Sequence, residues 1–130
     1  EGSYHPTQEQ VDVGHAAIDA GADIVWGSHP HVLQPIEAYN GGMIYYSLGN
    51  FVFGGNLYPK DLDSALLQQE IIRDETGVHL GELRIVPVSV SSIEKRNNFQ
   101  PTPWEPGTEE YDRVLSKLDG SFTGPNLTIG

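Results

Sequence analysis

Cysteine is absent from the 130 residues, which excludes disulfide bonds and thiolate metal sites. Basic residues are scarce as well, because seven Lys and Arg stand against eighteen Asp and Glu and give a net charge of -11. Nucleic-acid-binding proteins normally present a basic face, so we expect no nucleic-acid partner. The acidity would also repel an anionic polymer unless a divalent metal offset the field; acidity that serves only solubility is the simpler interpretation.

Long hydrophobic runs are missing too. No apolar stretch approaches about 18 residues, so no transmembrane helix is predicted. The chain also has no Gly-x-Ser-x-Gly nucleophile motif and no Gly-rich loop of the P-loop or dinucleotide type. These absences argue against serine-hydrolase and nucleotide-binding chemistry, and the length suits one domain.

The first part of the chain has the pattern of an α/β unit. A helix is predicted over residues 8–20, beginning at a capping box formed by Thr7 and Gln10. Gly21 suits the left-handed position that ends a helix. The apolar residues 22–26 then predict a short buried strand, so we expect an α/β (α+β layered) fold with mixed and antiparallel strands.

Two hairpins are predicted further along. Asn40-Gly41-Gly42 is a strong turn signal between an extended segment at 32–39 and a strand at 43–48. Strands at 64–73 and 78–90 form the second hairpin. We expect a core that includes the aromatic residues Trp26, Tyr45, Tyr46, Phe51 and Phe53.

The remaining residues are predicted to be two loops and one more helix. Loops are expected at 49–60 and at the proline-rich segment 91–107, and a helix at 108–118 with Gly120 after it. We therefore expect a single partial domain over 1–130, in three parts. The first part (1–60) contains the helix, the short strand, the candidate metal-binding loop and the first hairpin. The second part (61–90) is the second hairpin, and the third (91–130) is the long loop with the C-terminal helix.

Two histidines separated by one proline follow the first predicted strand. His29 and His31 flank Pro30, which stiffens the spacer. Neutral imidazole suits zinc, iron and manganese, so the pair is a candidate metal site. Two histidines are only part of a coordination sphere, however, and an ordinary surface loop is the alternative. The other histidines, His5, His15 and His79, are expected to be exposed or hydrogen-bonded rather than ligands.

The stretch from residue 20 to residue 53 closely resembles the CapA family of poly-γ-glutamate capsule-synthesis proteins. This family looks like a branch of the calcineurin-like metallophosphoesterases. Its last metal motif is matched by Gly27, His29 and His31, and its Ser-Leu-Gly-Asn-Phe signature is present in full at 47–51. The resemblance covers roughly residues 1–90. The family's earlier metal motifs, which supply an aspartate and a histidine, a bridging aspartate and an Asn-His pair, have no match here.

The resemblance implies that the chain is the C-terminal part of a metallophosphatase-like αββα sandwich. It implies that His29 and His31 each contact one metal of a divalent pair (Mn, Fe or Zn) in the full-length protein. Asn50, Glu1 and Ser28 are then candidates to orient a ligand or to contact the substrate, although Asn50 is equally explained as a turn residue. With two ligands only, the 130-residue chain is expected to be inactive alone.

Two functions stay open at this point. The full-length protein is interpreted either as a metal-dependent hydrolase in capsule synthesis, phosphoesterase-like or amide-cleaving, or as a non-catalytic scaffold or polymer-handling subunit of a membrane capsule-synthesis complex. The implied partners are the rest of its own domain, membrane capsule-synthase subunits and an anionic polymer substrate, and we expect self-association of the chain. By resemblance, the location is extracellular or at the surface of a bacterium, with a membrane-anchored parent.

Overall fold

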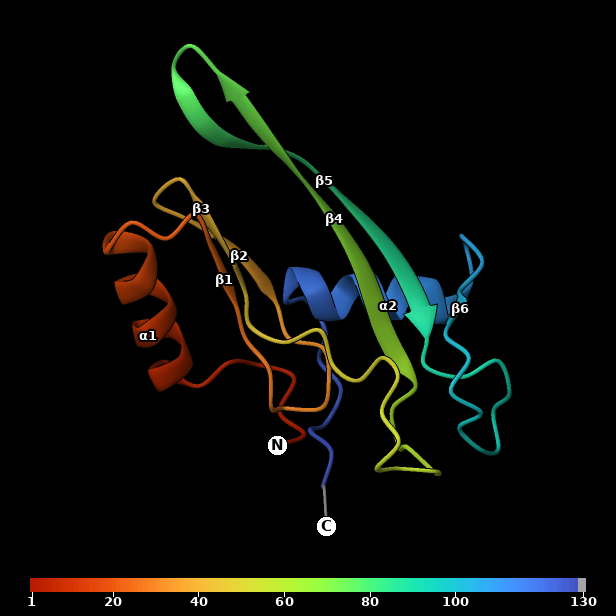
Figure 1. Cartoon of the computed structure of the whole chain (residues 1–130). Coiled ribbons are helices and arrows are strands. Elements are labelled where there is room, and N and C mark those ends of the chain that lie inside the picture. Colours follow the sequence, from red (N-terminus) through yellow and green to blue (C-terminus); the bar gives the residue numbers. More distant parts are fainter. Residues whose placement is uncertain (129–130) are drawn as a thin grey trace.

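The computed structural model describes residues 1–128 and has two helices and two three-stranded sheets within that range (Figure 1). The expected α+β class with mixed and antiparallel strands is confirmed. None of the helices in the described residues is long and apolar enough to cross a membrane. The elements are α1 (Gln8–Asp19), β1 (Ile24–Trp26), β2 (Ile36–Tyr39), β3 (Gly42–Tyr45), β4 (Asp63–Asp74), β5 (Gly77–Ser89), β6 (Thr102–Pro103) and α2 (Glu109–Asp119).

Helix α1 packs on the first sheet, which has the strand order β1-β3-β2. The predicted capping box is confirmed, because Thr7 Oγ1 accepts from the Gln10 amide and the Gln10 side chain accepts from the Thr7 amide. Strand β1 runs parallel to β3, and β2 and β3 form the predicted hairpin. The contact between helix and sheet is made by the buried side chains Ile18, Ile44 and Tyr46.

The second sheet is a long hairpin whose tip extends away from the rest of the molecule (Figure 1). Strands β4 and β5 pair from Asp63–Ser89 to Asp74–Gly77, with a bulge between Gln69 and Ile71. The predicted hairpin is confirmed. The predicted loop 91–107 is wrong at one point, because Thr102 and Pro103 pair with β5 as strand β6.

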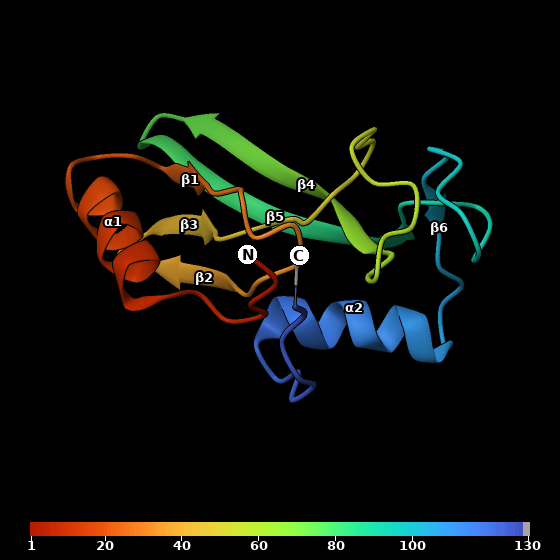
Figure 2. The ribbon, with the colours of Figure 1, turned by 90° about the horizontal axis from the view of Figure 1, so that it is seen from below.

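Helix α2 lies across the base of the long hairpin (Figures 1 and 2). The helix predicted over 108–118 with Gly120 after it is confirmed: Thr108 caps its first turn, and Gly120 follows it in the left-handed conformation with φ of 82°. Its buried side chains Val114 and Leu118 contact Leu33 and Ala65. Burying an aliphatic side chain of this size is worth about 1.5–3 kcal/mol, so this contact anchors α2.

Three of the aromatic residues predicted for the core lie at the surface. Tyr45 and Tyr46 are buried as expected, but Trp26 is 64% exposed and Phe51 and Phe53 are 39% and 40% exposed. Trp26 ends β1, which is an edge strand among the described residues, so no neighbouring strand covers it. Phe51 and Phe53 belong to the loop after β3, and Phe53 lines a cavity instead of filling the core.

Candidate metal-binding site

The loop after β1 carries both candidate ligands in an uncommon backbone conformation. The Gly27 amide donates to the Tyr45 carbonyl at 2.7 Å, which continues the pairing of β1 with β3 up to the loop. His29 and His31 then have φ of 97° and 60°, in a region that side-chain-bearing residues rarely adopt. The two imidazole rings end up with their centroids 6.3 Å apart.

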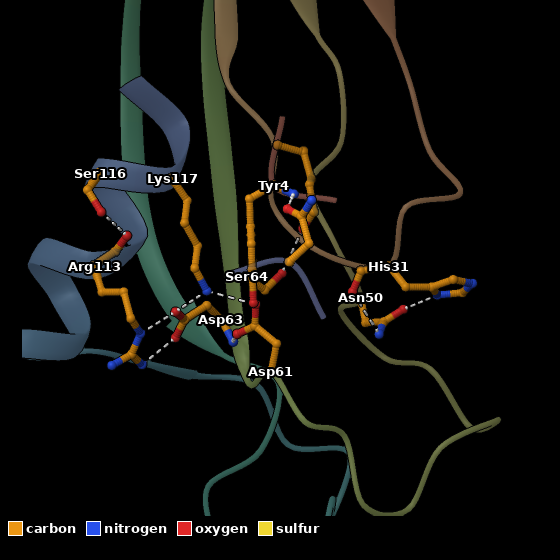
Figure 3. Close-up of polar contacts among 11 residues, drawn as sticks. Tyr4, His31, Asn50, Asp61, Asp63, Ser64, Arg113, Ser116 and Lys117 are labelled. Atoms are coloured by element: carbon orange, nitrogen blue, oxygen red, sulfur yellow. Dashed lines mark hydrogen bonds and ion pairs between the residues drawn. The ribbon is translucent and has the colours of Figure 1, made fainter. Parts of the chain in front are cut away.

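His31 is oriented by Asn50. The two come from different loops, and His31 Nδ1 lies 2.7 Å from Asn50 Oδ1 (Figure 3). An amide oxygen can only accept, so Nδ1 is the donor in this bond, and in the neutral imidazole Nε2 is then the nitrogen that can coordinate a metal. The Asn50 amide also donates to the His31 carbonyl at 3.4 Å. A ligating histidine is usually held through its other ring nitrogen in this manner, so the geometry suits coordination through Nε2.

The other sequence-predicted residues are divided between two places. Glu1 lies near His29, with 3.9 Å between Oε1 and Nε2, and it lines the same cavity as His31 and Asn50. Ser28 faces a separate groove that also contains Trp26 and Val13. The structure therefore brings Glu1, His29, His31 and Asn50 together and leaves Ser28 apart from them.

A cavity of about 440 Å³ adjoins His31. Its walls come from the N-terminus, the histidine loop, the loop after β3 and the segment after α2. Apolar side chains and polar groups alternate around it, as is typical of small-molecule sites. The residues that line the cavity include His31, Asn50, Phe53, Tyr58, Lys60 and Leu127.

The donors present fit part of a metal centre. Within residues 1–128, no group of three or more His, Asp or Glu side chains is placed to hold a metal ion. His29 and His31 supply two nitrogen donors, and catalytic zinc sites typically have three protein ligands. The described residues can therefore contribute to a metal sphere but do not complete one.

A buried ion network lies beside the cavity, and sequence reasoning missed it. Lys117 of α2 donates to Asp61 Oδ2 and to Asp63 Oδ2, both at 2.7 Å, and Arg113 binds Asp63 through two bonds of 2.7 and 2.8 Å (Figure 3). Tyr4 donates to Asp61 at 2.9 Å. Its pKa is raised by burial and by the adjacent Asp61 charge. No local pattern signals these pairs, because their partners are 50 or more residues apart in the sequence.

A second polar cluster joins α1 to the first sheet. His15 Nε2 lies 2.9 Å from Glu37 Oε1, and the Tyr46 hydroxyl donates to Glu37 Oε2 at 2.6 Å. The bond from Tyr46 holds the pKa of Glu37 below its ordinary value despite partial burial. The His15 ring also stacks on Tyr39 with centroids 3.7 Å apart. His15 is thus engaged in packing the helix, in agreement with the expectation that it is not a ligand.

Comparison with known proteins agrees with the fold and the histidine loop. The family model described as "Bacterial capsule synthesis protein PGA_cap" matches residues 1–55, the segment that contains α1, the first sheet and both motifs. The chain belongs to this family of bacterial capsule synthesis proteins.

Several curated relatives extend the match beyond residue 55. The chain is 42% identical over 97 residues to the PGA biosynthesis protein CapA of Bacillus subtilis, covering 70% of the chain and 25% of that protein. It is 42% identical over 85 residues to the capsule biosynthesis protein CapA of Bacillus anthracis, covering 65% and 20%. A probable polyglutamine synthesis accessory protein of Mycobacterium tuberculosis is 32% identical over 114 residues, covering 82% and 29%. The chain thus spans about a quarter of the length of the curated relatives it matches.

Proposed function

We propose that this chain is part of a capsule biosynthesis protein that handles poly-γ-glutamate, and that its histidine loop contributes His29 and His31 to a pair of divalent metal ions (Mn, Fe or Zn). The observation that carries the proposal is the bond between His31 Nδ1 and Asn50 Oδ1, which leaves Nε2 available beside the cavity. The names of the relatives, which are capsule and PGA biosynthesis proteins, support the biological role.

Hydrolysis is the chemistry that such a site would favour. A bound divalent ion supplies Lewis-acid activation of water and of a phosphoryl or carbonyl oxygen. The chain's own part is to hold the imidazoles in place and to present a cavity for the substrate. In this proposal, the remaining ligands come from parts of the protein outside these 130 residues, and the whole protein cleaves a phosphoester or an amide.

A non-catalytic role is the alternative, in which the protein acts as a scaffold or polymer-handling subunit of a membrane capsule-synthase complex. It is favoured by the finding that, within residues 1–128, no three His, Asp or Glu side chains are placed to hold a metal ion together. Metal-dependent turnover of a chromogenic phosphodiester or a γ-glutamyl amide by the whole protein, lost in His31→Ala, would support the hydrolase. Binding of polymer without turnover would support the scaffold. Either function would place the protein at the bacterial cell surface.

Metal binding by the chain itself is the direct test of the histidine loop. We expect the 130 residues to bind Zn²⁺ or Ni²⁺ weakly and to lose this binding in the double variant His29→Ala/His31→Ala, since neutral imidazoles are the donors. Asn50→Ala should weaken binding by about 10-fold, because His31 then loses its orienting bond. Isothermal titration calorimetry measures both effects.

The matched control is His5→Ala/His79→Ala, which removes two exposed histidines away from the loop. It should bind metal as the wild type does. Equal affinity in the two double variants would rule out the histidine loop as the metal site.

We also propose that the outer edge of β1 pairs with further strands in the whole protein and with a second copy in the isolated chain. Among residues 1–128, β1 has a neighbour on one side only, and Trp26 and Val13 lie exposed along the adjoining groove. Unpaired strand edges next to apolar surface promote association.

Sedimentation velocity on the isolated chain should reveal a dimer, and Trp26→Ser should weaken it. The control Ile93→Ser removes another exposed apolar side chain and should leave the dimer intact. A monomer at every concentration would contradict this proposal.

A further inference from the structure

Lys60 has an unusual position in both the sequence and the structure. It is the only Lys or Arg among residues 1–72 of a chain with a net charge of -11. It is also the only Lys or Arg among the residues that line the cavity beside His31. Lys60 can therefore attract an anionic group at short range, within the cavity, against the long-range repulsion from the net negative charge of the chain.

The Lys60 side chain is held in place by a hydrogen bond to a neutral group rather than by an ion pair. Lys60 Nζ donates to the Thr128 carbonyl at 2.6 Å, and in the described part of the chain no carboxylate forms an ion pair with it. The adjacent Asp61 is instead bound by Lys117 and Tyr4. An ammonium group has three donors, so two remain for a ligand.

A ring of hydrogen bonds closes around the same cavity. Gly2 donates to the Pro30 carbonyl at 2.8 Å and accepts from the Leu127 amide at 2.9 Å. Lys60 then joins Thr128 to the loop after β3, and Asn50 in that loop joins His31. Four segments distant in sequence are therefore fixed to one another around the opening, which preorganises the site.

The cavity wall suits a chain that alternates carboxylates with methylene groups. Phe53, Tyr58, Pro59 and Leu127 offer apolar surface, and Lys60 offers the positive charge. The lining also contains the carboxylates of Glu1 and Asp61, of which Asp61 is already paired with Lys117. We propose that Lys60 determines specificity by binding a carboxylate of a γ-linked glutamyl chain that lies in this cavity with its next linkage toward His31. The proposal rests on the proposed function, because it takes the polymer as the ligand, but it does not depend on the metal.

The test is binding of a short γ-linked glutamate oligomer to the 130-residue chain, without metal, by isothermal titration calorimetry at low ionic strength. Lys60→Met should raise the Kd at least about 10-fold, which is about 1.4 kcal/mol, because it removes a hydrogen bond between two charged groups. Lys60→Arg should retain most of the affinity. Lys95→Met, which removes an exposed lysine from another loop, should change the Kd less than about twofold.

A γ-linked isoglutamine oligomer, in which each free α-carboxylate is replaced by a carboxamide, separates recognition from a purely structural role. It has the same shape without the charge, so it should bind the wild type weakly and be insensitive to Lys60→Met. If Lys60 only fastens Thr128, the substitution should weaken both oligomers equally, and the proposal would be wrong. Equal Kd values for Lys60→Met and Lys95→Met, or no binding by the wild type, would also overturn it.

Two further measurements test which anion Lys60 binds and whether that binding is independent of the metal site. Inorganic phosphate should compete poorly with the glutamate oligomer. If phosphate competes at a concentration equal to that of the oligomer, Lys60 accepts any anion, and the assignment of a carboxylate chain as the ligand is wrong. Adding EDTA should leave binding of the glutamate oligomer to the wild type within about twofold of its value in untreated protein, because Lys60 acts through its own charge and needs no metal. Failure of metal binding alone therefore leaves the role of Lys60 intact.

Discussion

Lys117→Met should lower the free energy of unfolding by about 3–5 kcal/mol, because removing one member of a buried ion network leaves the others uncompensated. Lys117 is 2% exposed, and its partner Asp63 has a fully buried side chain. The Asp61 carboxylate would keep the bonds from the Tyr4 hydroxyl and the Asp63 amide but would lose its cation, and the Asp63 carboxylate would keep only the bonds from Arg113. Urea denaturation followed by circular dichroism measures the change.

The loss should depend on pH in a defined direction. Burial alone would raise the pKa of Asp63, but the bonds from Arg113 and the charge of Lys117 outweigh it and hold that pKa below its ordinary value. A carboxyl with a lowered pKa stabilises the fold above its unfolded pKa of about 3.9, and this contribution is lost as the pH falls through the folded value. The difference between wild type and Lys117→Met should therefore be largest near neutral pH and shrink below about pH 4.

Lys95→Met is the control for this experiment, because it removes the same charge from an exposed loop. Its effect should stay within about 0.5 kcal/mol. A loss below about 1 kcal/mol for Lys117→Met would mean that the network contributes little beyond an ordinary surface pair.

Gly27→Ala should destabilise the chain by about 3 kcal/mol, and it should disturb the histidine loop directly. A Cβ atom at residue 27 would collide with the Tyr46 carbonyl oxygen and would lie 3.2 Å from that of Tyr45. Both are backbone atoms of the neighbouring strand or its extension, so neither can rotate away. The glycine of the Gly-Ser-His motif is thus required for β1 to lie close to β3.

The control is Gly54→Ala, at a position where an added Cβ has no neighbour within 4 Å and φ is not positive. Thermal unfolding should place this variant near the wild type, and Gly27→Ala well below it. If the two variants melt together, β1 is free to move away from β3 and the loop geometry is adaptable.

The local elements were predictable because their signals are local. Thr7 and Gln10 mark the start of α1, and Asn40 with Gly41 marks a turn in which both residues have positive φ. Strand β6 was missed because a proline-rich segment resembles a loop, and two residues pair too briefly to leave a pattern. Trp26 was misjudged because an apolar residue in a strand is usually buried, whereas it ends a strand with one uncovered edge.

The candidate site was predictable only in part. His29, His31 and Asn50 come from recognisable motifs, and the structure joins His31 to Asn50. Lys60 had a signal that sequence reasoning passed over, since it is the first basic residue in the chain. The Lys117 network had none, because ion pairs between segments more than 50 residues apart depend on the tertiary fold.

The bonds that join the two ends of the described chain have a consequence for folding. The Tyr4 amide donates to Asn126, and the Leu127 amide donates to Gly2, so both contacts span more than 120 residues. Contacts of such high sequence separation form late, because a long loop must close before they contribute. During synthesis, the first sheet and α1 can pair as soon as they emerge, whereas the wall of the cavity is completed only after residue 128. Among the described residues, the bond from Lys60 to Thr128 would thus form after the histidine loop, and a ribosome-bound intermediate would have that loop in place before its lysine was fastened.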